Sequence, residues 1–333
     1  MNQVPTLATV AELAGVSRQT VSNALNNPTL LLPETLARVQ AAIEQLGYSP
    51  NRAARQLRTR SSHLIGLRVD AHAETEASAL MDRFQHSLVQ ATGLMNHHVL
   101  LFTGDPEDPL DGYTEVLRST GVDGFIVTDT YAGTPQADFL KARKVAFVTF
   151  GRPWDDPESD HAWVDVDGAA GGRLATEHLV EMGHAKVAWL GWEETSRIGE
   201  DRRSGWQGRA PSGSPAGRIT DNVDAARMAA HELLETPDVT GFACVSDTVA
   251  QGVLHACHER GLRPGADIGV TGFDDSPAAQ VVWPGLTSVR APLEEVAVRL
   301  VEVLQLVLSG EEYGDRGRML TPTLVVRGSS LRQ

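Results

Sequence analysis

The chain has 333 residues, of which 41% are hydrophobic and 22% charged, and its formal net charge is −14. This length is typical of a globular protein with about two to three domains. No stretch approaches the roughly 18 uninterrupted apolar residues of a membrane span, and the N-terminus has no apolar leader, so neither membrane insertion nor secretion is expected. The two cysteines, Cys244 and Cys257, have no CxxC spacing, which fits a reducing cytoplasm and argues against a disulfide framework.

The charge is unevenly distributed along the chain. Residues 1–62 contain six arginines, no lysine and three glutamates, a net charge of +3, and the other 23 basic and 40 acidic residues leave −17 for the rest. Four of the six arginines fall in the acid-free segment 49–62. A small basic part on a large acidic part predicts that only residues 1–62 contact a polyanion. An uneven scatter by chance is the alternative.

The first 46 residues predict three short helices. The first ends at Gly15, which can adopt the positive φ of a helix terminus. Ser17 is suited to cap the next helix, "SRQTVSNAL". The third begins at Pro33 and ends before Gly47. None of the three could bury its apolar stripe alone, so we expect them to pack as one small bundle.

Two helices joined by a tight glycine turn are typical of the helix-turn-helix motif, whose second helix enters the major groove of DNA. Val21 and Leu25 give this helix an inward apolar stripe. The polar residues on its opposite face are Arg18, Gln19, Ser22 and Asn23. Gln and Asn can pair bidentately with adenine, and Arg with guanine. The alternative is an ordinary three-helix module with a polar outer face.

From His63 onward, short apolar runs alternate with amphipathic stretches, as in "LIGLRV", "LMDRFQHSLVQATGLMN" and "HVLLF". This alternation predicts right-handed β-α-β units and parallel sheets. About 260 residues of it exceed the size of one domain, so we expect two doubly wound lobes. The expected ligand site is the cleft between them, at the carboxyl ends of strands. Residues 208–218, rich in Pro, Gly and Ser, are predicted to be a loop.

Several strings resemble the LacI/GalR family of bacterial transcription regulators. They are "TVAELAGVSRQTVSNALN", "GYSPNRAARQL", "GHAKVAWLG", "SDTVAQGVLHACHERGL", "DIGVTGFDDSP" and "LTSVRAP". The resemblance extends from about Leu7 to the closing "TPTLVVRGSS" and so covers nearly the whole chain. It implies an N-terminal all-α helix-turn-helix domain followed by an α/β core of two doubly wound parallel-sheet lobes like those of periplasmic binding proteins.

The resemblance also implies a division of the chain. A DNA-binding domain is expected at 1–48, a hinge helix or linker at 49–62, and an effector-binding and dimerisation core at 63–333. Within the core, the ranges expected for lobe 1 are about 63–161 and 291–320, and those for lobe 2 about 162–290 and 321–333.

In this family the segment matching 49–58 forms a short helix on DNA and pairs with its twin in the minor groove. Ala53 and Ala54 are small enough for two such helices to approach each other, and Leu57 could unstack a central base step. A solvated basic linker is the alternative. The residues expected to contact DNA are Ser17, Arg18, Gln19, Thr20, Ser22, Asn23, Tyr48, Asn51, Arg52, Ala54, Leu57 and Arg58.

Four positions match effector-binding positions of the family. Arg202 could hold ligand hydroxyls or a carboxylate bidentately, and Asp274, in "GFDD", could accept hydroxyl hydrogen bonds. Ser246 and Asp70 match two further polar positions. A strand-end polar group that caps a neighbouring helix is the alternative for each.

The sequence also departs from the family. "LLLPETL" replaces the usual Val-Ser cap of the third helix, and the chain after Gly205 is shorter than usual, which leaves the pocket aromatic unassigned. Two enzyme-like features have simpler explanations. "DGAAGGR" fits neither phosphate-loop pattern and is interpreted as a turn onto a close-packed helix. His255 and His258 could hold a metal, but a pair on a helix surface is favoured.

The sequence therefore predicts a cytoplasmic, ligand-responsive DNA-binding repressor without enzymatic activity, cofactor or metal. It would bind a pseudo-palindromic operator as a homodimer, with a tetramer as the alternative, and a sugar or sugar derivative would release it. Co-repression or activation, and less favoured, a sugar-binding module or a cleft enzyme, are the other readings.

Overall fold

The structure is a computed structural model of the chain. It describes residues 5–48, 61–69, 76–128, 130–131, 133–154, 156, 158–311, 314 and 317–332. The chain divides into two compact units, residues 1–62 and residues 63–333.

The first unit is a bundle of three helices, as the sequence predicts. Its elements are α1 (Leu7–Ala14), α2 (Arg18–Asn26), a 3-10 turn (Pro28–Leu30) and α3 (Pro33–Leu46). Gly15 and Gly47 end α1 and α3 in the left-handed conformation, with φ of 63° and 60°. The backbone of Leu32 begins α3 without a side-chain cap, in agreement with the departure noted in "LLLPETL". Buried Val10, Val21 and others form the bundle's core.

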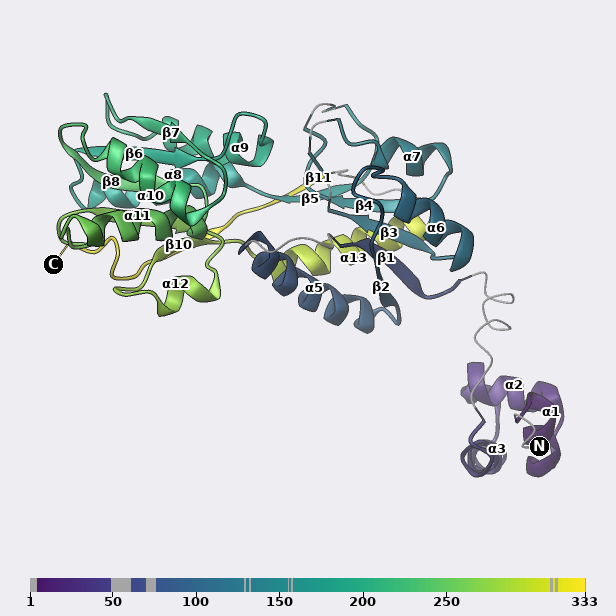
Figure 1. Cartoon of the computed structure of the whole chain (residues 1–333). Helices are drawn as coiled ribbons and strands as arrows, with labels where there is room; N and C mark the ends of the chain where they lie inside the picture. The colour runs from purple at the N-terminus through teal and green to yellow at the C-terminus, as the bar shows by residue number, and fades with distance from the viewer. Residues whose placement is uncertain are drawn as a thin grey trace. The chain divides into compact units, whose positions relative to one another are not determined.

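The second unit contains two six-stranded sheets among its described residues (Figure 1). Its strands are β1 (Leu64–Arg68), β2 (His98–Phe102), β3 (Gly124–Val127), β4 (Ala146–Phe150), β5 (Trp163–Val166), β6 (Lys186–Gly191), β7 (Ala216–Arg218), β8 (Val239–Cys244), β9 (Gly269–Phe273), β10 (Thr287–Arg290), β11 (Gly317–Leu320) and β12 (Thr323–Val325). The strand orders are β11-β5-β4-β3-β1-β2 and β12-β10-β9-β8-β6-β7. Every pairing is parallel except that of β10 with β12.

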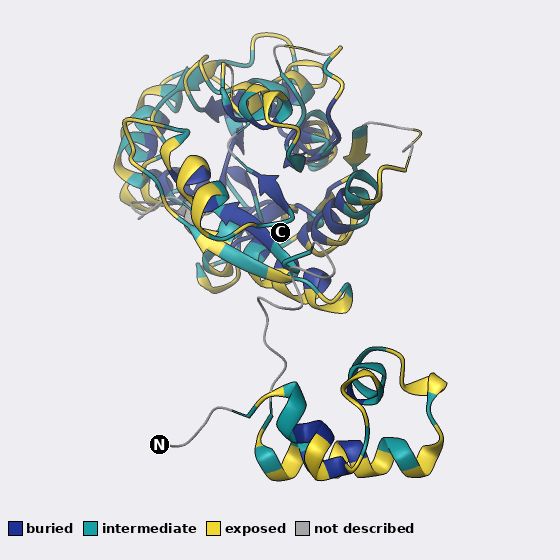
Figure 2. Cartoon of the chain, turned by 90° about the vertical axis from the view of Figure 1, so that its right-hand side faces the viewer, coloured by how far each residue is buried: buried dark blue, intermediate teal, exposed yellow. Residues whose placement is uncertain are grey.

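Helices cover both sheets. They are α5 (Glu76–Leu94), α6 (Asp111–Ser119), α7 (Gln136–Ala142), α8 (Gly168–Glu181), α9 (Arg197–Gln207), α10 (Val223–Leu233), α11 (Asp247–Glu259), α12 (Pro277–Val281) and α13 (Leu293–Ser309). In β3, Ile126 packs with Leu88 of α5 and Leu300 of α13, whereas its neighbour Phe125 packs with Tyr113 of α6. This alternation buries both faces of the first sheet, and Figure 2 shows the strands as the most buried part of the unit.

The chain crosses between the sheets after Val166, after Arg290 and between β11 and β12. The first crossing lies beyond the expected boundary near 161, because β5 pairs with β4 and so belongs to the first sheet. The predicted loop 208–218 likewise ends in a short edge strand, β7, paired with β6. Within the described ranges, none of the helices has the length and apolarity needed to cross a bilayer.

Candidate functional site

The second helix of the first unit presents a polar surface. Ser17 caps it, since its hydroxyl accepts a hydrogen bond of 3.1 Å from the Thr20 backbone N–H. Arg18 and Gln19 are exposed, whereas Val21 is fully buried. The face of α2 opposite Val21 is therefore exposed and can enter the major groove of DNA.

Two amides on this helix form a pair one turn apart. The Gln19 side-chain amide donates a hydrogen bond of 3.0 Å to Asn23 Oδ1. With this assignment of the amides, the Asn23 amino group and the Gln19 carbonyl retain hydrogen-bonding capacity for a base edge. Ser22 lies on the same helix and accepts a hydrogen bond of 2.6 Å from Asn26 at its backbone carbonyl.

The remaining predicted DNA contacts differ in kind. Tyr48 packs against the core of the bundle and is partly buried, so its ring also stabilises the end of α3. The predicted hinge contacts lie outside the described residues: Asn51, Arg52, Ala54, Leu57 and Arg58.

A cavity of about 140 Å³ lies between the two sheets of the second unit; we call it the cleft cavity. Thr128 and Phe150 contribute to its wall at the carboxyl ends of β3 and β4, and Phe273 does so at the end of β9. Ile198, on α9, also lines it. This is the position at which doubly wound folds bind ligands.

Arg202 of α9 forms the polar part of the wall on the second sheet's side. Its guanidinium donates hydrogen bonds of 2.7 Å to the Val245 carbonyl and 3.1 Å to Asp274 Oδ1. It also lies over the Phe273 ring, 3.7 Å from the ring centroid. The buried Nε of Arg202 has no hydrogen-bond partner among the described residues. Because buried donors are rarely left unpaired, this atom is a candidate ligand contact.

Glycines allow α9 to approach α8 closely enough to place Arg202 there. A Cβ on Gly172 would lie 2.0 Å from the Arg202 carbonyl oxygen, and one on Gly205 would lie 2.0 Å from the Ala169 carbonyl oxygen. A Cβ on Gly168 would meet Asp201 at 2.7 Å. The "DGAAGGR" string therefore serves helix packing, as the sequence interpretation proposed.

On the opposite side of the cleft, Arg152, just beyond β4, does not line the cavity itself but pairs with two carboxylates that do, Asp165 and Asp201. Its Nε donates a hydrogen bond of 2.7 Å to Asp165 of β5, and its Nη2 donates one of 2.9 Å to Asp201 of α9. The Arg152–Asp201 ion pair therefore joins the two sides of the cleft. Burial raises the pKa of Asp201 above its usual value, and the charge of Arg152 acts against that rise. The Arg152 guanidinium also lies over Trp154, 4.2 Å from the ring centroid.

Asp274 and Asp275 form an unusual turn after β9. Their φ angles are 99° and 46°, a left-handed backbone that is uncommon for residues other than glycine. Asp275 is buried and paired with Arg290 and Arg327, each at 2.6 Å. Arg83 of α5 donates a hydrogen bond of 3.1 Å to the Asp275 carbonyl, a second link between the two lobes.

The structure brings Arg202 and Asp274 together but places Ser246 in a different role. The Ser246 hydroxyl caps α11 by accepting from the Val249 N–H at 3.2 Å and donates to Asp221 at 2.8 Å. Neither Ser246 nor Asp274 is among the residues that line the cleft cavity, whereas Arg202 is. Asp70 lies outside the described residues.

Sequence reasoning missed Arg152, Asp201 and the aromatic residues of the cavity. Arg152 could have been found, because it follows the strand-like run "VAFVTF" and strand ends line such clefts. No pattern in the sequence identifies Asp201 or Trp154 as a residue of the site. The aromatic side chains of the wall are Phe150, Trp154 and Phe273, none of which comes from the shortened region after Gly205.

The histidines of "HACH" do not converge with the intervening cysteine. His255 and His258 are exposed on α11, whereas Cys257 is fully buried. Among the described residues, no three His, Cys, Asp or Glu side chains are grouped as metal ligands.

A helix-turn-helix unit joined to two parallel-sheet lobes with a cavity between them defines a ligand-controlled DNA-binding regulator. Comparison with known families agrees. Residues 6–51 match the model "Bacterial regulatory proteins, lacI family", and residues 176–330 match "Periplasmic binding protein-like domain". The curated regulator CelR of Thermobifida fusca is 32% identical over 98% of each chain. The chain belongs to the LacI family of bacterial transcription regulators.

Solved structures of the family superpose on most of the chain. The lac repressor dimer bound to operator and an anti-inducer has a TM-score of 0.80 and 26% identity over 99% of this chain and 100% of its own. A complex of CelR with cellobiose has a TM-score of 0.70 and 28% identity over 98% and 99%.

Proposed function

We propose that this regulator is a homodimeric repressor of the cytoplasm that binds a pseudo-palindromic operator and is released by a sugar. One observation carries the proposal: the same chain combines a capped recognition helix with a cavity whose wall offers an arginine donor and aromatic faces. The helix would occupy the major groove of a half-site, with Gln19 and Asn23 at base edges.

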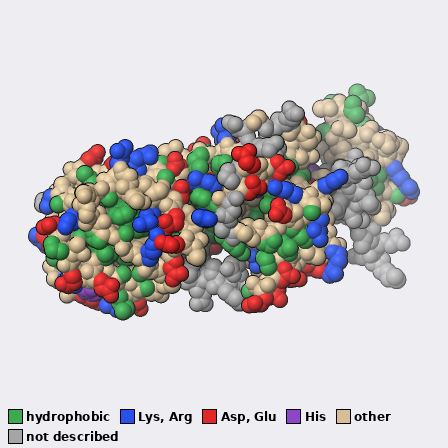
Figure 3. Space-filling model, turned by 90° about the horizontal axis from the view of Figure 1, so that it is seen from above, with side chains coloured by type: hydrophobic (Ala, Val, Ile, Leu, Met, Phe, Trp, Pro, Cys, Tyr) green, Lys and Arg blue, Asp and Glu red, His purple; other side chains and the backbone are tan. Residues whose placement is uncertain are grey.

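The distribution of charged side chains on the core favours an effector-binding role and argues against a second DNA-binding surface. Acidic and basic side chains are intermixed on the face of residues 63–333 seen in Figure 3. Phosphate binding requires clustered positive charge instead. The two arginines beside the cleft, Arg152 and Arg202, are bound to carboxylates.

A sugar fits the chemistry of the cleft cavity. Phe150, Trp154 and Phe273 offer apolar faces for a ring, and Arg202 Nε offers a donor to a hydroxyl. CelR has been solved with cellobiose, which extends the same expectation to this chain. Links between the lobes, such as Arg152–Asp201, would respond to the ligand, provided that it binds the two core states with different affinity.

A second copy of the chain would cover an apolar surface of the core. Val89 and Leu94 of α5 are 54% and 87% exposed, and Val281 and Trp283, at and beyond the end of α12, are 84% and 90% exposed. In Figure 1 both helices lie along the lower side of the second unit. Large apolar patches on a protein surface mark protein interfaces. We propose that these side chains meet a second copy of the chain, so we expect Trp283→Asp to shift the protein towards monomer in sedimentation. Met228→Asp, a change at a 62% exposed site on α10, is the control.

The proposal is tested by selecting bound duplexes from a random library with the full-length protein. We expect a two-fold symmetric site, and lower recovery when glucose, ribose or cellobiose is added. The variant Gln19→Ala/Asn23→Ala should lose the base preferences, since each bidentate contact contributes about 1–3 kcal/mol of discrimination. Absence of any enriched site would refute the repressor assignment, and turnover of a sugar would revive the cleft enzyme.

A further inference from the structure

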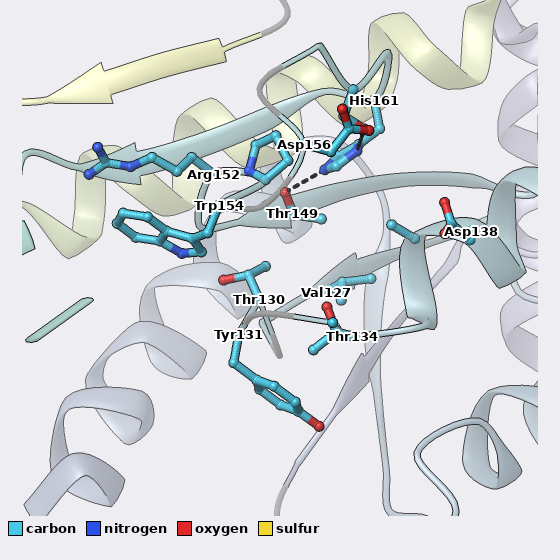
Figure 4. A pocket seen from close by; sticks show the side chains of 14 residues that line it. Val127, Thr130, Tyr131, Thr134, Asp138, Thr149, Arg152, Trp154, Asp156 and His161 are labelled. Atoms are coloured by element: carbon cyan, nitrogen blue, oxygen red, sulfur yellow. Dashed lines mark hydrogen bonds between the residues drawn. The ribbon is translucent and has the colours of Figure 1, made fainter. Parts of the chain in front are cut away.

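A second cavity, of about 190 Å³, lies beside the cleft cavity in the lobe of the first sheet (Figure 4). Its described lining residues come from the end of β3 and the segment after it, up to residue 138, and from the end of β4 and the segment after it, up to residue 161; we call it the loop cavity. Thr130 and Trp154 line both cavities, so the two share a wall. In Figure 4, Arg152 and Trp154 lie at one end of the loop cavity and His161 lies at the other.

The far end of the loop cavity is held by a chain of hydrogen bonds. Lys141 donates to the Ser159 hydroxyl at 3.0 Å, and Ser159 contacts His161 Nδ1 at 2.8 Å. His161 Nε2 contacts the Thr149 hydroxyl at 3.2 Å, and that hydroxyl donates to the Gly151 carbonyl at 2.7 Å. Donors and acceptors agree when His161 is neutral with its proton on Nε2. Burial, and after it the charge of Lys141, lowers the pKa of His161 to about 4, which keeps the ring neutral.

The charges around the loop cavity disfavour an anion. Of the described residues that line it, Arg152 alone is cationic, and its guanidinium is already bound to Asp165 and Asp201. Asp138 and Asp156 add negative charge to the lining. A phosphate or carboxylate group would therefore be repelled, whereas a neutral group that hydrogen-bonds is tolerated.

The shared wall offers groups that suit a sugar ring. The buried Nε1 of Trp154 has no hydrogen-bond partner among the described residues. Away from the shared wall, Tyr131, which is 60% exposed, and Thr134 add an aromatic face and a hydroxyl to the loop cavity alone. An apolar ring face beside donors and acceptors is the environment that an amphipathic polyhydroxyl ring requires.

Size points to one ligand that spans both cavities. Neither cavity alone reaches the roughly 300 Å³ at which small-molecule pockets begin, whereas the two together exceed it. Building on the sugar effector proposed above, we propose that the loop cavity is a second subsite. It holds the second ring of a neutral disaccharide whose first ring lies in the cleft cavity at Arg202. The glycosidic link would cross between Thr130 and Trp154.

The test compares monosaccharide with disaccharide binding to the full-length protein by calorimetry, with glucose, cellobiose and maltose as the probes. We expect at least one disaccharide to bind about tenfold more tightly than glucose, the contribution of one or two additional well-made contacts. Thr134→Phe, which fills the loop cavity, should abolish that difference and leave glucose binding unchanged. Thr114→Phe, an exposed site on α6, is the matched control and should preserve the difference.

Each other outcome overturns a stated part of the proposal. If glucose and both disaccharides bind the unmodified protein equally, the second subsite is refuted while the sugar-responsive function stands. If the disaccharide advantage survives Thr134→Phe, the second ring lies outside the loop cavity and the subsite is again refuted. If none of the three sugars binds, the sugar effector itself is refuted, and the subsite with it. Unchanged glucose binding also shows that the Thr134→Phe variant is folded.

Discussion

Each side of the cleft holds an arginine against carboxylates, but the two arginines are held differently. Arg202 is held within its own lobe by the Val245 carbonyl and Asp274. Arg152 is held by Asp165 of its own lobe and by Asp201 of the other. The contacts of Arg202 therefore lie within one lobe, whereas Arg152 needs Asp201 of the other lobe for one of its two ion pairs. We infer that Arg202 contributes to ligand affinity and Arg152 to the coupling between lobes.

The carboxylate cluster behind Arg202 provides the largest expected effect. Burial, and after it the charge of Asp274, raises the pKa of Asp247 to about 7, far above its usual value of 3.8. The folded protein therefore binds a proton more tightly than the unfolded chain. The contribution of Asp247 to stability should be fully present below about pH 4 and be lost as the pH rises to about 7, a loss of at most about 4 kcal/mol.

Asp247→Asn should remove this pH dependence, because its amide mimics the neutral acid. The Asn side chain can still accept from the Ser276 N–H, which now donates to Asp247 at 2.6 Å, and can donate to the Ser288 hydroxyl. Thermal unfolding of both proteins between pH 4 and pH 8 measures the difference. Parallel curves would mean that Asp247 is ionised throughout that range in the folded protein.

Arg202→Ala should weaken sugar binding about 100-fold, since a hydrogen bond to a charged group contributes roughly 1.5–3 kcal/mol. Operator binding without sugar should persist, because α2 lies in the other unit. Arg203→Ala is the control, since Arg203 does not line the cleft cavity and its ion pair among the described residues is with Glu200 of the same helix, at 3.3 Å. A normal sugar response in the Arg202 variant would remove this residue from the effector site.

The packing of α9 on α8 provides the next test. Gly205→Ala would place a Cβ 2.0 Å from the Ala169 carbonyl oxygen and force the helices apart. We expect a loss of roughly 1–3 kcal/mol of stability together with weaker sugar binding, because Arg202 moves with α9. Gly208→Ala, at the end of the same helix, meets its nearest atom at 3.6 Å and should be neutral. Equal melting temperatures for the two variants would show that the helices can separate without loss.

Sequence predicted the features that depend on neighbours along the chain. The caps at Ser17, Gly15 and Gly47 and the α/β alternation were confirmed, because each follows from local backbone chemistry or periodicity. The strand β5 was missed, because a strand of four residues is too short to show a recognisable alternation of apolar and polar side chains. The contact between Arg152 and Asp201 also has no local signal, because it depends on how two lobes pack.

The dependence on packing between elements also explains why the effector residues expected from the family resemblance take different roles in the structure. Arg202 and Asp274 were proposed from a resemblance to a family, and the structure places them in contact. Ser246 was proposed on the same grounds, but its hydroxyl begins α11 and bonds to Asp221. A strand-end position identifies a residue near the cleft; it does not specify whether the side chain turns to the ligand or to the next helix.

Arg152→Gln should give the smallest of these effects and the most specific one. It removes the ion pair with Asp201 across the cleft while keeping a polar side chain. The affinity for a monosaccharide in the cleft cavity should change little, but the factor by which the sugar weakens operator binding should fall about tenfold, a coupling loss of about 1.4 kcal/mol. Operator titrations with and without saturating sugar measure that factor. Arg299→Gln, which breaks a pair within α13 alone, should leave it unchanged. If the coupling factor of Arg152→Gln also stays unchanged, the Arg152–Asp201 ion pair has a structural role only. The hydrogen bond from Arg83 to the Asp275 carbonyl then becomes the next candidate for coupling between the lobes.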